Sequence, residues 1–141
     1  MPKYSYVLFI IAFALRLYSI IAERIYERRT MRLFFERGCA GFRWCRRFPL
    51  ESKTEIREFL DVFIKAFGYQ KKRRLYFAPD DKIMEFYRIR YLPNCLIDCM
   101  ELEDLVTGLR KKYGVDVLGT WREDITLGDL FTLTRGTRVY V

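Results

Sequence analysis

The sequence predicts an all-α protein, a small helical bundle preceded by a long apolar N-terminal helix. Segments between residues 51 and 141 repeat apolar side chains every three or four positions and carry helix start and stop signals. Residues 4–22 form an apolar run close to the length that spans a bilayer. We expect an apolar helix over residues 1–30, a basic aromatic linker over 31–50 and a helical domain over 51–141.

The apolar run has the features of a single-pass membrane anchor. Its only charge is Arg16, near one end, where a long side chain reaches the interface. Lys3 alone precedes the run. Five arginines follow it: Arg24, Arg28, Arg29, Arg32 and Arg37. Because cytoplasmic flanks are enriched in Lys and Arg, the pattern predicts that residues 4–22 cross the membrane and that the C-terminal domain is cytoplasmic.

Other interpretations of the run stay open. It fits an amphipathic helix at the membrane interface, or a helix packed on the bundle through Phe9, Ile10, Phe13 and Leu17. A cleaved signal peptide fits less well, because the positive charge follows the apolar residues. Translation from Met31 would remove the run and leave a cytoplasmic protein.

Positive charge is concentrated in the first third of the chain. Residues 1–50 hold 10 Lys/Arg and 3 Glu, whereas residues 51–141 hold 16 Lys/Arg and 15 Asp/Glu. A nucleic-acid-binding domain normally carries its basic patch on the folded unit, so we expect no nucleic-acid partner. Arginines and aromatic residues alternate over 31–48, a composition that suits lipid headgroups and, as an alternative, single-stranded nucleic acid.

The first helix of the domain is predicted between Ser52 and Gly68. Ser52 and Glu55 form a capping-box pattern, and Gly68 supplies the stop. Six apolar residues fall on one face: Ile56, Phe59, Leu60, Phe63, Ile64 and Phe67. The "KKRR" at 71–74 that follows is expected to be a solvated loop.

Three further helices are expected. Asp80 or Asp81 would begin one that ends at Pro93-Asn94, with Ile83, Met84, Phe86, Tyr87 and Ile89 as its apolar residues. Asp98 would cap the next, which has Glu101 in its first turn and ends at Gly114. Its buried stripe would be Leu102, Leu105, Val106, Leu109 and Tyr113. Thr126 and Asp129 form the start signal of the last helix, which would bury Leu127, Leu130 and Phe131.

Two of these segments resemble the acyl carrier protein superfamily. That family has a helix of the form D-S-L-x-x-x-E-L-V-x-x-L-E-x-x-F-G and a last helix that opens I-T-x-G-D-L. The text "DCMELEDLVTGLRKKYGVDV" aligns without a gap, with Asp98 on the Asp, Met100 on the Leu and Tyr113-Gly114 on the Phe-Gly. "EDITLGDLF" falls on the last-helix signature. The resemblance covers about residues 51–135 and implies a four-helix bundle.

The resemblance also implies a site at the start of the second motif. A carrier holds phosphopantetheine on the motif serine, where helix N-H groups favour the phosphate. Here Cys99 occupies that position, between Asp98 and Met100. Because transfer of the group forms an oxygen-phosphorus bond, we expect no phosphopantetheine. Whether Cys99 is an inert thiol or a reactive one that carries an acyl group or senses oxidation stays open.

Together these patterns predict a non-catalytic carrier-like module that binds a protein partner, such as an enzyme of acyl-chain or fatty acid metabolism. Carriers usually present an acidic second helix, and here the candidates are Glu101, Glu103 and Asp104. A functional acyl carrier in lipid or secondary-metabolite synthesis is the alternative.

The chain has no histidine, which excludes catalytic triads and other chemistry based on imidazole. Any zinc site would use only cysteines, and the spacings C-x5-C and C-x3-C predict reduced thiols and no metal.

Overall fold

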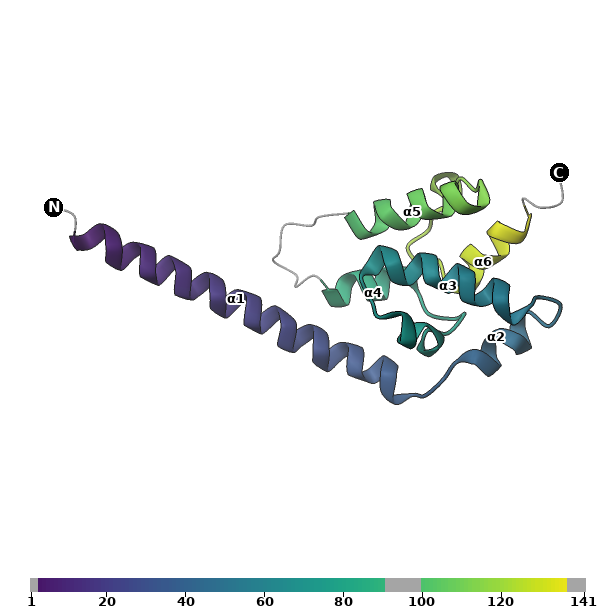
Figure 1. Cartoon of the computed structure of the whole chain (residues 1–141). Helices are drawn as coiled ribbons and strands as arrows, with labels where there is room; N and C mark the ends of the chain where they lie inside the picture. Colours follow the sequence, from purple (N-terminus) through teal and green to yellow (C-terminus); the bar gives the residue numbers. More distant parts are fainter. Residues whose placement is uncertain (1–2, 91–99, 137–141) are drawn as a thin grey trace.

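The computed structural model describes residues 3–90 and 100–136, and these residues are mostly helical, as the sequence predicts (Figure 1). Extended pairing within them is limited to an antiparallel bridge between Lys82 and Thr126. The elements in chain order are α1 (Lys3–Glu36), α2 (Gly41–Arg47), α3 (Lys53–Phe67), the 3-10 helix η1 (Lys71–Tyr76), α4 (Ile83–Arg90), α5 (Met100–Tyr113), the 3-10 helix η2 (Leu118–Thr120) and α6 (Leu127–Gly136).

The N-terminal half of α1 projects away from the other helices (Figure 1). Every side chain from residue 6 to residue 21 is exposed. Phe9 and Ile10 are 72% and 64% exposed, so they do not pack on the described domain. This helix is long and apolar enough to cross a membrane.

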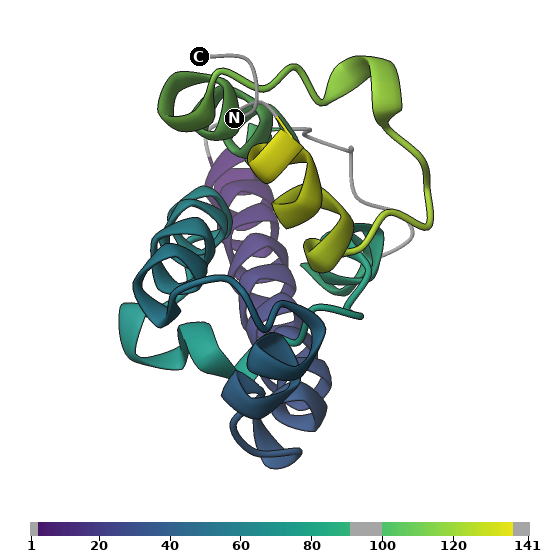
Figure 2. The same cartoon turned by 90° about the vertical axis from the view of Figure 1, so that its right-hand side faces the viewer.

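The C-terminal turns of the same helix belong to the domain. Met31 is only 4% exposed, and the rings of Phe34 and Phe86 lie 4.9 Å apart. Directly after the helix, Arg37 donates hydrogen bonds to the Asp81 carboxylate and, at 3.0 Å, to the carbonyl of Tyr76. One continuous helix therefore joins the exposed apolar segment to the folded domain. In Figure 2 its N-terminal half lies behind the domain helices.

Residues 31–50 do not form the linker expected from their composition. Trp44 on α2 is 1% exposed, and its indole N-H donates to the carbonyl of Phe77 at 2.7 Å. Its ring packs against Phe48 and Phe131. The physical reason for the correction is that aromatic residues in this segment complete the protein core instead of facing lipid headgroups. Phe42, which is 76% exposed, is the exception.

Helix α3 is the central element of the core. Ser52 Oγ accepts the N-H of Glu55 at 3.1 Å and the Glu55 carboxylate accepts the N-H of Ser52, which confirms the capping box. Gly68 ends the helix at a φ of 69°, a left-handed conformation that favours glycine. All six predicted apolar residues are buried. They pack against α5, and Phe59 lies 5.2 Å from Phe131 of α6.

The basic run at 71–74 is a 3-10 helix, not the solvated loop we expected. Arg74 donates to both carboxylate oxygens of Asp61, at 2.9 and 3.0 Å. The Arg73 guanidinium lies 4.1 Å from the ring centroid of Phe35. Arginines bind carboxylates through pairs of hydrogen bonds and stack on aromatic rings. Arg73 and Arg74 therefore contact the domain, whereas Lys71 and Lys72 are exposed.

Helices α4 and α6 begin side by side. The expected helix after Asp81 is α4, which buries Ile83, Phe86 and Tyr87. The Leu127 N-H donates to the carbonyl of Asp81 at 2.9 Å, across the antiparallel bridge. The predicted stop at Pro93-Asn94 lies outside the described residues.

The last helix has the expected start signal. The Thr126 N-H donates to the Asp129 carboxylate at 3.1 Å, and the Asp129 N-H donates to Thr126 Oγ1 at 3.1 Å. Leu127, Leu130 and Phe131 are all buried.

Candidate functional site

The predicted carrier site lies at the start of α5. Asp98 and Cys99 are outside the described residues, so the cap and the thiol remain predictions. Met100, the next residue, is the first of α5 and is 58% exposed. Leu105 and Leu109 are fully buried farther along the helix, as expected. The start of α5 is therefore accessible, whereas its middle is fixed in the core.

The three predicted partner-binding acids occupy different surroundings. Glu103 and Asp104 are exposed, and Glu101 is half-buried. Asp104 lines a groove of about 600 Å³ between α3 and α5, together with Lys65 and Lys111. The acids thus do not form a uniform acidic face.

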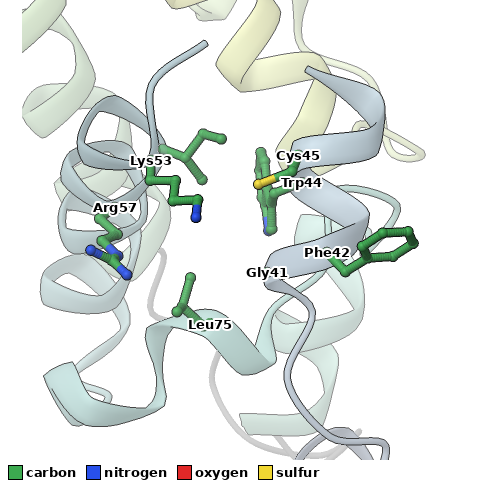
Figure 3. Close-up of a pocket in the computed structure, with 8 residues that line it drawn as sticks. Gly41, Phe42, Trp44, Cys45, Lys53, Arg57 and Leu75 are labelled. Atoms are coloured by element: carbon green, nitrogen blue, oxygen red, sulfur yellow. The ribbon is translucent and has the colours of Figure 1, made fainter. Parts of the chain in front are cut away.

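A second concave site, absent from our sequence predictions, lies between α2, α3 and η1 (Figure 3). Its volume is about 460 Å³, within the range of small-ligand sites. The lining residues are Gly41, Phe42, Trp44, Cys45, Lys53, Ile56, Arg57 and Leu75. Figure 3 shows Lys53 and the Cys45 sulfur facing each other across the gap, with Leu75 below and the Phe42 ring turned away.

The cations of this cavity differ from those on the neighbouring surface. On α2, Arg43 binds Asp80 at 2.6 Å, and Arg47 binds Asp80 at 3.1 Å and Asp129 at 3.2 Å. Within residues 3–90 and 100–136, Lys53 and Arg57 form no ion pair or hydrogen bond with a carboxylate. Two cations of the cavity are therefore available to an external anion.

The surroundings of Asp129 lower the pKa of its carboxyl group. Burial raises its pKa, but the hydrogen bonds from Thr126 and the charges of Arg47 and Arg122 outweigh that effect. Its pKa is therefore lower than the ordinary value of 3.8, and the carboxylate stays ionised at neutral pH. This group stabilises the start of α6 and the contact with α2.

The described residues contain no cluster of three or more metal-binding side chains. Cys39 is exposed and Cys45 half-buried, and both are free thiols. Cys95 lies with Cys99 outside the described ranges.

Comparison of the chain with protein families, with curated proteins and with solved structures gives no match.

The sequence predicted the acidic residues Glu101, Glu103 and Asp104 at the start of a helix, which is α5, but it did not predict the α2–α3 cavity. The cavity is built from three elements separated along the chain, and no local pattern connects Cys45, Lys53 and Leu75. A usable signal was the pair Lys53 and Arg57, two cations four residues apart on the first turns of a helix.

Proposed function

We propose that the chain is a non-catalytic, acyl-carrier-like module, tethered to the cytoplasmic face of a membrane by the first half of α1, that acts by binding a protein partner. One observation carries the proposal. Residues 6–21 are mostly apolar, with Arg16 as the one charged residue, and all of their side chains are exposed. An exposed apolar surface of this length is costly in water and marks a membrane or protein contact. Its helical form pairs backbone N-H and C=O groups within the segment, as a bilayer requires.

The junction between tether and domain supports this arrangement. Because Met31 and Phe34 pack into the domain, the helix is anchored there at its C-terminal end. The tether then presents the domain close to the bilayer surface.

Basic residues follow the apolar segment at the depth where headgroups lie. Arg24 and Arg28 of α1 and Arg73 of η1 line one groove of about 840 Å³. Helical rise places Arg24 about 3 Å and Arg28 about 9 Å beyond Ala22, within reach of the headgroup layer. Arginines at this depth suit the cytoplasmic leaflet, which carries anionic lipids.

The carrier-like part of the proposal rests on the order of α3, α5 and α6 and on the two sequence motifs. Exposed Glu103 and Asp104 on the first turns of α5 are the residues offered to a basic partner surface. The four-helix carrier arrangement is part of the proposal.

Topology can be tested with reporters fused after Val141. A fluorescent protein that folds only in the cytoplasm should be bright, and alkaline phosphatase, which needs an oxidising compartment, should be inactive. Active phosphatase and a dark fluorescent protein would contradict the cytoplasmic location.

A working acyl carrier is the second candidate, and the exposed start of α5 at Met100 favours it. Intact mass spectrometry of protein from its native cell separates the two functions. The non-catalytic module has the mass of the unmodified chain. An added phosphopantetheine or thioester-linked acyl mass, mapped to the peptide that contains Cys99, would replace the first proposal with the second.

A further inference from the structure

The cavity between α2, α3 and η1 has two properties that the fold alone does not require. Its walls are largely apolar, with Trp44, Ile56 and Leu75 among them. Lys53 and Arg57 carry positive charge at its α3 side, where both are exposed and neither forms an ion pair with a described residue.

The position of these cations is unfavourable for α3 itself. Lys53 is the first residue of the helix, where the positive end of the helix dipole disfavours a cation. Arg57 follows four residues later, and like charges at this spacing repel each other. The nearby acids Glu51 and Glu55 form ion pairs with Arg135 instead. A cation pair that opposes helix stability is the kind of local conflict expected at a functional site.

We infer that this cavity binds an amphipathic carboxylate, a small anion of the fatty-acid type. Its carboxylate would bind Lys53, which extends into the gap in Figure 3, with Arg57 one turn farther along α3 adding positive charge, and its apolar chain would lie against Leu75 and the edges of Trp44 and Ile56. The volume of about 460 Å³ fits a small molecule better than a protein partner, since a stable protein interface needs a much larger contact. This site is independent of the tether and of the α5 surface.

Cys45 provides a direct readout, because its thiol faces the cavity (Figure 3). Full-length protein in phosphatidylcholine nanodiscs is alkylated with N-ethylmaleimide at increasing concentrations of octanoate, and modification of the Cys45 peptide is followed by mass spectrometry. Cys39, an exposed thiol outside the cavity lining, is the internal control. Octanoate should slow alkylation of Cys45 and leave Cys39 unchanged. Octanol and acetate, which lack the charge or the chain, should protect at concentrations at least about tenfold higher.

Two double variants test the cations. Lys53→Gln with Arg57→Gln should raise the octanoate concentration for half-protection about tenfold, because charge-assisted hydrogen bonds are lost. The melting temperature should stay the same or rise, since the unfavourable charges are gone. Lys65→Gln with Lys111→Gln removes the same charge from the α3–α5 groove and should leave protection unchanged.

Three results would each overturn the inference. Equal protection by octanol and octanoate would mean an apolar void without anion recognition. Loss of folding stability in the Lys53 and Arg57 variant would make these cations structural. Protection by an acetylated Leu-Asp-Leu peptide but not by octanoate would identify a docking site for protein.

Discussion

At the residue scale, Trp44 joins α2 to the protein core. It is 1% exposed, donates a hydrogen bond to Phe77 and contacts the rings of Phe48, Phe59 and Phe131. Trp44→Ala should lower the free energy of unfolding by about 3–5 kcal/mol, measured by chemical denaturation. Phe42→Ala, two residues away on the same helix but 76% exposed, is the matched control and should change it by less than about 0.5 kcal/mol. Equal effects would mean that Trp44 faces outward.

Also at this scale, Asp129 links stability to pH. Its pKa is lower in the folded protein than the ordinary 3.8, so its contribution to stability is present above that value and is lost as the pH falls through the folded-state pKa. Asp129→Asn keeps an acceptor oxygen for Thr126 but removes the charge that binds Arg47 and Arg122. The variant should melt below the parent protein at pH 7, and the difference should shrink below pH 3.8. A difference that is constant down to pH 2.5 would show that Asp129 is not the titrating group.

At the element scale, helices with strong local signals were predictable. Capping pairs and the left-handed glycine act within a few residues, which is why Ser52, Gly68 and Thr126 mark the ends of α3 and the start of α6 as the sequence predicted. The short α2 and the 3-10 helix η1 lack such signals. Their arginines bind carboxylates far along the chain, as Arg43 of α2 binds Asp80, and local patterns do not encode these pairs.

The contact between α3 and α5 gives a prediction at the same scale. Gly108 lies inside α5, and a Cβ atom there would come within 2.9 Å of Val62 Cγ1. Alanine gains about 1 kcal/mol of helix propensity over glycine, but β-branched Val62 has little freedom to move, so Gly108→Ala should destabilise the protein.

The variant Gly108→Ala with Val62→Ala should recover part of this stability, because the clash is removed. A double-mutant cycle by thermal denaturation measures the coupling. Additive effects would contradict close packing of the two helices at this point.

At the scale of the whole molecule, α1 has two halves with different surroundings. Composition predicted the apolar first half, because a run over residues 4–22 is visible without any fold. That the same helix continues into the core through Met31 was not predictable, since Phe34 and Phe35 face partners on α4 and η1 that depend on tertiary packing. The predicted site at Cys99 stays a prediction, and the α2–α3 cavity depends on the tertiary arrangement of three elements.

The proposed membrane tether is tested most directly by fractionation of the full-length protein after a high-salt wash. Burial of an apolar helix in lipid is insensitive to salt, whereas attachment through arginines alone is screened. We expect the full chain to stay in the membrane fraction. A variant that begins at Met31, which keeps the buried turns of α1 but lacks residues 1–30, should become soluble or bind only at low salt. Full-length protein that is soluble without detergent, or that leaves the membrane in high salt, would contradict the tether.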